Sequence, residues 1–228
     1  KQREGNVFRV SLVGYTNSGK SSLLNSLSCS NVGVEDKLFA TLDPTTRRIE
    51  LKGGREIVVT DTVGFINKLP HDLIDAFKST LEEALYSDLL IHVVDGSNEN
   101  YETQIKVVNQ VLGELGVKNK PIVIAVNKID KLNDGEKPFI PISNLAERVV
   151  YISAKEKMNL IDVMDAIEYY ATLNSEIVEI FLPYSHGHLT SYLHENGRVL
   201  ESEYKNEGIY LKGEFNSLVI GRIQEFIL

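Results

Sequence analysis

The chain has 228 residues, 43% hydrophobic and 25% charged, which suits a soluble globular protein with one sizeable domain and a smaller second one. Its formal net charge of −8 lacks the basic footprint of a general nucleic-acid binder, so no DNA partner is expected. Cys29 is the single cysteine, which excludes an internal disulfide, and no apolar run is long enough for a membrane span. We expect a cytoplasmic protein and a monomer.

The first predicted element is a short β-branched run, Val7–Val13, that is typical of a buried strand. GYTNSGKS follows, and apolar residues then recur at helical spacing over Ser21–Ser28. This is a G-x-x-x-x-G-K-[ST] phosphate loop in the strand–loop–helix context that it needs, although an ordinary glycine turn is the alternative.

The chemistry of this loop indicates a nucleoside triphosphate. Backbone N–H groups and the helix N-terminus would bind phosphates, and Lys20 would reach the β- and γ-phosphates. The Ser21 hydroxyl would be a ligand of Mg²⁺. The residues assigned to nucleotide binding here are Gly14, Tyr15, Thr16, Asn17, Ser18, Gly19, Lys20, Ser21 and Ser22.

A polar segment without a clear period, Asn31–Arg48, predicts a loop. Thr41, Thr45 and Thr46 are candidates to bind Mg²⁺ through a hydroxyl while the backbone N–H meets the γ-phosphate. Such a loop is ordered by the triphosphate and released after hydrolysis. A solvated surface loop is the alternative for each threonine.

Arg48–Leu51 and Glu56–Thr60 are expected to form a hairpin that ends at a second motif, DTVG. An acid at the end of a buried strand is the expected Walker B ligand of Mg²⁺, although such an acid can also be a simple turn residue. The glycine can offer its N–H to the γ-phosphate because it lacks a Cβ atom. The nucleotide-binding residues assigned here are Asp61, Thr62, Val63 and Gly64.

Further along, the pattern predicts helices over Asp72–Tyr86 and Glu102–Leu115 and buried strands over Leu89–Val94 and Pro121–Val126. The last strand leads into NKID, residues 127–130. Here the nucleotide contacts are assigned to Asn127, Lys128, Ile129 and Asp130.

NKID indicates guanine. The Asp130 carboxylate can accept hydrogen bonds from guanine N1–H and the 2-amino group, and adenine lacks both donors. Asn127 can bridge the base and the phosphate loop, and the Lys128 stem can lie over the base plane. After a strand at Val149–Ile152, a backbone N–H in the segment Ser153, Ala154 and Lys155 can meet guanine O6.

Strands alternating with helices predict an α/β fold for residues 1–174: a mostly parallel six-stranded sheet with helices on both faces. Motifs at the carboxyl ends of its strands would meet at one edge. Residues 175–228 have the order β-α-β-β-α, which predicts a small α+β domain, ferredoxin-like with its last strand absent. Asn216 is expected to cap a terminal helix from Ser217.

The strings KLFATLDPTTRRIEL and TDTVGF, together with the motifs above, resemble the HflX family of P-loop GTPases. The resemblance implies Mg²⁺-dependent GTP hydrolysis to GDP, with Lys20, Thr41 and Gly64 in catalysis. It implies a large ribosomal subunit as partner, and rescue or splitting of stalled ribosomes under stress. It selects Thr41 as the switch threonine and Mg²⁺ ligand with Ser21 and Asp61. The switch residues that it adds to the nucleotide site are Phe39, Ala40, Thr41, Leu42 and Asp43.

The chain departs from the family in one respect, and from many small GTPases in another. It opens KQREGNVF without an initiator Met and lacks the family's long N-terminal domain, so we expect a piece of a longer protein. Phe65 occupies the place where many small GTPases have a water-orienting glutamine, which predicts slow intrinsic turnover. A further cofactor, K⁺, is expected if Asn17 helps to hold it as in related GTPases; the alternative is that Asn17 only braces the loop.

Two other functions stay open at this point. One is a GTP-dependent binding switch with negligible turnover, in which Phe65 marks lost catalysis. The other is a GTPase that serves ribosome assembly or tRNA modification.

Overall fold

The structure is a computed structural model that describes residues 7–28, 45–52, 54–65, 83–117, 120–133, 137–140, 148–173 and 175–228. It divides into two compact units, Phe8–Ile167 and Glu168–Leu228. The division falls within helix α4 (Leu160–Thr172), and the predicted domain boundary at residues 174 and 175 lies just after this helix. None of the helices in the described ranges has the length and apolar character needed to cross a membrane.

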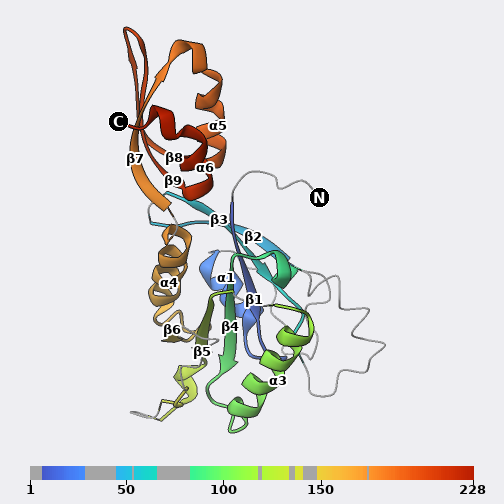
Figure 1. The fold of residues 1–228 in the computed structure, drawn as a ribbon. Coiled ribbons are helices and arrows are strands. Elements are labelled where there is room, and N and C mark those ends of the chain that lie inside the picture. The colour runs from blue at the N-terminus through green and yellow to red at the C-terminus, as the bar shows by residue number, and fades with distance from the viewer. Residues whose placement is uncertain are drawn as a thin grey trace. The chain divides into compact units, whose positions relative to one another are not determined.

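The first unit is built on a six-stranded sheet in the order β2-β3-β1-β4-β5-β6 (Figure 1). Every neighbouring pair is parallel except β2 and β3. The predicted mostly parallel sheet is therefore confirmed. Its strands are β1 (Phe8–Val13), β2 (Thr45–Glu50), β3 (Glu56–Asp61), β4 (Leu89–Asp95), β5 (Ile122–Asn127) and β6 (Arg148–Tyr151).

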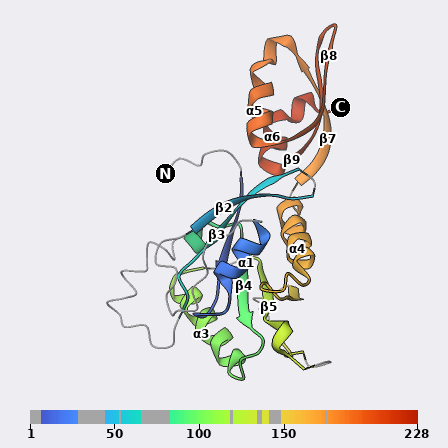
Figure 2. The same ribbon diagram turned by 180° about the vertical axis from the view of Figure 1, so that it is seen from behind.

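Helices cover both faces of this sheet, with α1 (Lys20–Leu27) on one side and α3 (Tyr101–Glu114) on the other (Figures 1 and 2). The side chains of α3 pack into a buried cluster with residues of the central strands. This cluster includes Val13, Leu90, Val108, Leu112 and Ile122. The short 3₁₀ turn η1 (Ile129–Lys131) begins one residue beyond the end of β5, after Lys128.

The prediction for Asn31–Arg48 was wrong at its end, because the first hairpin strand begins at Thr45 rather than Arg48. Thr45 pairs with Asp61 and Thr46 with Thr60, and the two hydroxyls of that second pair lie 3.1 Å apart. Pairing with a buried partner strand outweighs the polar composition that favoured a loop. Of the predicted helix at 72–86, residues 83–86 are helical and the others lie outside the described residues.

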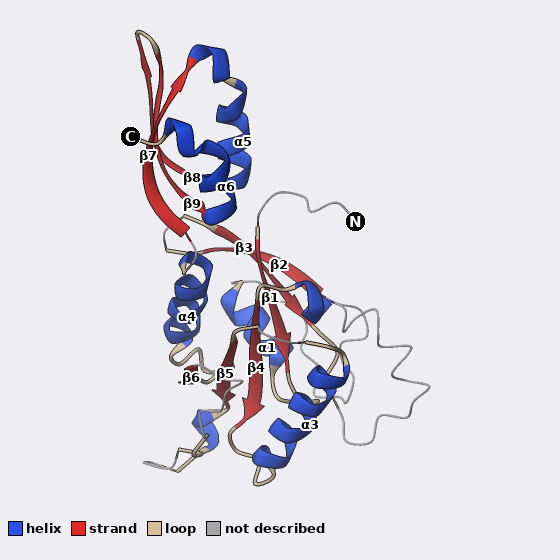
Figure 3. Ribbon diagram, viewed as in Figure 1, coloured by secondary structure: helices blue, strands red, loops and turns tan. Residues whose placement is uncertain are grey.

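The second unit has a three-stranded antiparallel sheet in the order β7-β9-β8, with α5 and α6 on one face (Figure 3). The element order agrees with the predicted β-α-β-β-α. Its elements are β7 (Ser175–Pro183), η2 (Tyr184–His186), α5 (His188–Asn196), β8 (Gly197–Lys205), β9 (Gly208–Asn216), α6 (Ser217–Ile223) and η3 (Gln224–Phe226).

Apolar side chains of both helices pack on this sheet in one buried cluster that includes Leu193, Ile223, Ile180, Leu211 and Phe215. The predicted helix cap is confirmed, since the Asn216 side-chain oxygen accepts a hydrogen bond from the Val219 backbone N–H at 3.0 Å.

The two outer strands of this sheet differ. Next to β7, the Leu228 backbone N–H donates to the Glu179 carbonyl at 2.9 Å, and Ile227 bridges to Ile180. On the other side, β8 is an edge strand of the sheet with exposed side chains from Leu200 to Lys205 and an irregularity in its pairing between Val199 and Glu201.

Candidate nucleotide-binding site

Five strands of the first unit bring their carboxyl ends to one edge of the sheet. Because β1, β3, β4, β5 and β6 are parallel, the segments that leave them lie on the same side. The sequence motifs leave from four of these strands. The residues at or just beyond the five strand ends are Gly14, Asp61, Asp95, Asn127 and Ser153.

Three glycines make room at this edge. A Cβ atom on Gly14 would lie 2.3 Å from the Val93 carbonyl oxygen, and one on Gly19, whose φ is +98°, would lie 2.2 Å from Asn127 Nδ2. A Cβ atom on Gly64 would lie 2.8 Å from Thr16 Cα and 3.1 Å from Lys20 Nζ. The phosphate loop is therefore packed against both neighbouring motifs at distances that only glycine permits.

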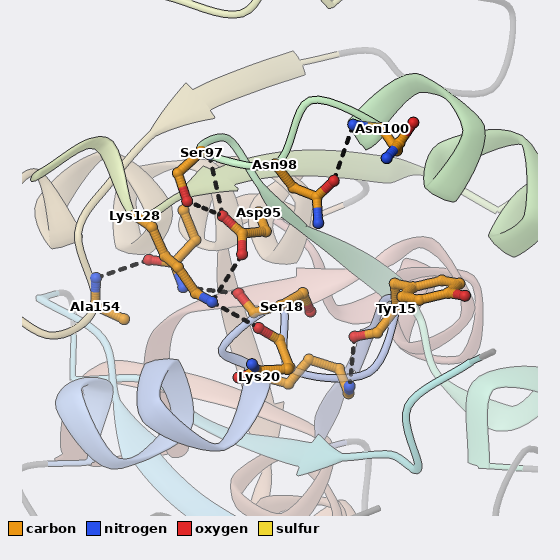
Figure 4. Close-up of polar contacts among 11 residues, drawn as sticks. Tyr15, Ser18, Lys20, Asp95, Ser97, Asn98, Asn100, Lys128 and Ala154 are labelled. Atoms are coloured by element: carbon orange, nitrogen blue, oxygen red, sulfur yellow. Dashed lines mark hydrogen bonds and ion pairs between the residues drawn. The ribbon is translucent and has the colours of Figure 1, made fainter. Parts of the chain in front are cut away.

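Lys20 is enclosed by the loop that precedes it. Its Nζ atom donates to the carbonyl oxygens of Gly14 and Tyr15, both at 3.4 Å, and the side chain is buried (Figure 4). Burial lowers the pKa of Lys20 to about 8, and the nearby Asp61 carboxylate partly opposes this shift. Phosphate oxygens would supply the negative charge that favours the protonated lysine.

The predicted magnesium ligands Ser21 and Asp61 lie together. The Ser21 hydroxyl donates to Asp61 Oδ2 at 2.5 Å, and Asp61 is buried at the end of β3. The hydroxyls of Thr16 and Ser18 are buried nearby and have no hydrogen-bond partner within the described ranges. A hydroxyl and a carboxylate are the oxygen donors that Mg²⁺ prefers, so these residues fit that ion. The third predicted ligand, Thr41, lies outside the described residues.

The NKID and SAK segments are tied to the phosphate loop. Asn127 Nδ2 donates to the Ser18 carbonyl oxygen, and Asn127 Oδ1 accepts from the Ala154 backbone N–H, both at 2.9 Å. Asp130 is exposed, and its Oδ1 accepts from the Ser153 hydroxyl at 2.5 Å. The carboxylate predicted to recognise guanine is therefore accessible, and the Ser153 hydroxyl holds its orientation through Oδ1.

Lys128 has two partners. Its Nζ donates to the Asn17 carbonyl oxygen at 2.8 Å and forms an ion pair with Asp95 Oδ2 at 2.7 Å (Figure 4). The Asp95 Oδ1 atom accepts from the backbone N–H and the hydroxyl of Ser97, at 3.0 and 2.7 Å. Sequence reasoning missed Asp95, although it ends the buried run LLIHVVD just as Asp61 ends β3.

Ser26 of α1 was also missed. Its hydroxyl donates to the Ala154 carbonyl oxygen at 2.6 Å, so the helix that follows the phosphate loop also holds the SAK segment.

Phe65 is turned away from this edge. Its backbone N–H donates to the Gly14 carbonyl at 3.0 Å, and its carbonyl accepts from the Thr16 N–H at 2.8 Å. Its ring is 1% exposed and packs in the cluster with Val13 and Leu90.

The other predicted site residues occupy less central places. Tyr15 forms a backbone bridge with Phe65. Ser22 lies in the first turn of α1, and Ile129 begins η1. The Lys155 ammonium is exposed and 3.4 Å from Glu156. The predicted switch residues Phe39, Ala40, Thr41, Leu42 and Asp43 lie outside the described residues.

The fold and the site define a P-loop GTPase. Residues 9–128 match the family model described as "50S ribosome-binding GTPase". An archaeal GTP-binding protein from Sulfolobus solfataricus, solved in complex with GDP, is 34% identical with a TM-score of 0.57, over 73% of this chain and 53% of that one.

The chain belongs to the family of P-loop GTPases that this model describes and, within it, is similar to the HflX proteins. It is 45% identical to the GTPase HflX of Caldanaerobacter subterraneus over 100% of this chain and 52% of that protein. It is 40% identical to the GTPase HflX of Akkermansia muciniphila over 100% of this chain and 53% of that protein. The chain thus spans about half the length of these curated relatives.

Proposed function

We propose that this chain binds Mg²⁺-GTP at the carboxyl edge of its six-stranded sheet and hydrolyses it to GDP and phosphate. The observation that carries the proposal is the pair of hydrogen bonds made by the Asn127 side chain. They join the phosphate loop at Ser18 to the SAK segment at Ala154. These bonds hold the strand end that leads to the exposed Asp130 carboxylate against the phosphate loop, which supports recognition of one guanine nucleotide.

The side chains would divide the work as follows. Lys20 and the loop N–H groups would balance the charge of the β- and γ-phosphates, and the Gly64 N–H would donate to the γ-phosphate. Ser21, Asp61 and Thr41 would hold Mg²⁺. The ion, when bound, neutralises charge that develops on the phosphate oxygens.

The proposed intrinsic turnover is slow. The Phe65 ring is in the core and carries no polar group to orient water, so another residue, a partner or an ion must complete the catalytic machinery. K⁺ is one candidate, because the exposed Asn17 lies in the phosphate loop with a φ of +59° and its carbonyl is already fixed by Lys128.

The proposed partner is the large ribosomal subunit, with splitting or rescue of stalled ribosomes as the cellular role, in the cytoplasm. The description of the matched family and the identity to HflX proteins support this proposal. The remaining half of those relatives would contribute to the contact. The alternatives are a nucleotide-dependent switch with negligible turnover and a GTPase of ribosome assembly or tRNA modification.

Base recognition is tested with Asp130→Asn. The variant should lose GTP affinity and gain affinity for xanthosine triphosphate, because the new amide donates to the xanthine 2-oxo group. Asp165→Asn is the matched control, since Asp165 is an exposed residue on α4 that pairs with Lys52. Titration of both variants with GTP and with xanthosine triphosphate measures the four affinities that test base recognition. An unchanged GTP affinity in Asp130→Asn would contradict the proposal.

Catalysis and partner are tested by multiple-turnover phosphate release in K⁺ or Na⁺ buffer, with and without purified large subunits. Stimulation by subunits supports the ribosomal role. Tight GTP binding without turnover under any condition favours the binding switch. Preference for precursor subunits or for tRNA over mature large subunits favours the third alternative.

A further inference from the structure

Asp95 lies at the carboxyl end of β4, between the strands that lead to the phosphate loop and to NKID. It has no assigned role in nucleotide binding, yet its side chain is only 15% exposed and both of its oxygens are engaged. A carboxylate with so little exposure needs a charged or hydrogen-bonding partner, because its burial would otherwise be costly. Asp95 is therefore placed to hold such a partner in position.

The carboxylate is itself fixed. The backbone N–H and hydroxyl of Ser97 hold Oδ1 at 3.0 and 2.7 Å, which leaves Oδ2 to face Lys128. The Gly96 N–H donates to the Asn127 carbonyl at 2.9 Å, and a Cβ atom on Gly96 would lie 2.7 Å from a Val126 methyl carbon. The loop of Asp95 is thus fastened to the strand that carries NKID.

Lys128 needs such support. Its own φ is +65°, a left-handed conformation that a residue with a side chain adopts at a cost, so neighbouring contacts must hold it. Its ammonium lies 2.7 Å from Asp95 Oδ2 and 2.8 Å from the Asn17 carbonyl oxygen, with the side chain 18% exposed (Figure 4). These contacts fix the ammonium end of a methylene stem that runs between NKID and the phosphate loop.

We propose that Asp95 is a positioning residue for nucleotide binding, which holds the Lys128 stem in the place where it forms an apolar floor under the guanine base. The proposal rests on the proposed function of the site. Because Asp95 acts through the Lys128 ammonium, it would support contact with the face of the purine and leave base selection to Asp130. The charge-assisted bond between Asp95 and Lys128 is of the stronger kind in proteins.

The test is Asp95→Asn, measured with GTP and with inosine triphosphate, which lacks the 2-amino group. Loss of the Asp95 charge should lower the affinity for both nucleotides equally, by about ten-fold, because contact with the face of the purine does not depend on the 2-amino group. The Michaelis constant should rise while kcat stays unchanged, since contact with the base is the same in ground and transition states. Ser97→Ala should show the same pattern with a smaller effect.

A double-mutant cycle separates positioning from a general structural role. If Asp95 acts through Lys128, Asp95→Asn should have no further effect on affinity in a Lys128→Met background. Additive losses, a parallel fall in kcat, or an unchanged affinity in the single variant would overturn the inference. Asp165→Asn again serves as the control of equal charge change. Failure of the unaltered chain to bind GTP would instead overturn the proposed function.

Discussion

The buried Lys20 makes nucleotide binding depend on pH in a way that can be calculated. In the nucleotide-free chain its pKa is lowered to about 8 by burial. Phosphate oxygens around the ammonium would raise this pKa again, toward the ordinary lysine value of 10.5. Binding and protonation therefore favour each other, and the contribution of Lys20 to affinity is complete below pH 8 and falls as the pH rises from there toward the pKa in the complex.

The magnitudes follow from these two values. At pH 8.5 the free chain would hold Lys20 about three-quarters deprotonated, so binding should take up about 0.75 proton. Between pH 7 and pH 8.5 the affinity should fall about four-fold, which is about 0.8 kcal/mol. This range stays below the pH at which the guanine base loses its own N1 proton.

The assay is calorimetric titration with a non-hydrolysable GTP analogue at pH 8.5 in two buffers that differ in ionisation enthalpy. The difference in apparent heat gives the number of protons taken up. Lys20→Met should abolish the uptake, whereas Lys52→Met, which removes an exposed ammonium paired with Asp165, should retain it. Binding without proton uptake, or uptake that persists in Lys20→Met, would refute the reasoning.

Three further substitutions test the site. Gly19→Ala should lower GTP affinity at least about one hundred-fold, because the new Cβ atom would clash with Asn127 Nδ2 and because residue 19 has a φ of +98°. Fluorescent nucleotide titration measures this affinity, and a near-normal value would contradict the close packing. Ser21→Ala should bind GTP equally with Mg²⁺ and with a chelator, whereas a retained Mg²⁺ effect would remove Ser21 as a ligand. Phe65→Gln should cost about 3 kcal/mol in urea unfolding without speeding turnover, because the side chain lies in the core; faster phosphate release would show that residue 65 reaches the reaction.

The predicted site residues that the structure brings together are those that short stretches of sequence determine. The glycine pattern of the phosphate loop requires a particular backbone, and the buried run before NKID identifies the strand that delivers it. The residues of the two motifs meet because parallel strands share a carboxyl edge. Asn127 was expected to join base and phosphate loop, and its bond to the Ser18 carbonyl agrees with that expectation.

The parts that were missed depend on distant pairs. The bond between Ser26 and Ala154 joins residues 128 positions apart, and that between Asp95 and Lys128 joins residues 33 apart. No local pattern encodes such pairs, because each side chain alone resembles an ordinary surface residue. The start of β2 was missed for the same reason: Thr45 belongs to a strand only through its register with Asp61.

The outer strand of the second unit has a consequence for how the protein behaves in concentrated solution. An edge strand has unpaired backbone groups that another chain can extend into a larger sheet. Here β8 carries the exposed charges of Glu201, Glu203 and Lys205, and its irregular pairing near Val199 interrupts a flat edge. A second copy that paired in parallel register would bring each glutamate against its own counterpart. We therefore expect β8 to resist strand-by-strand polymerisation.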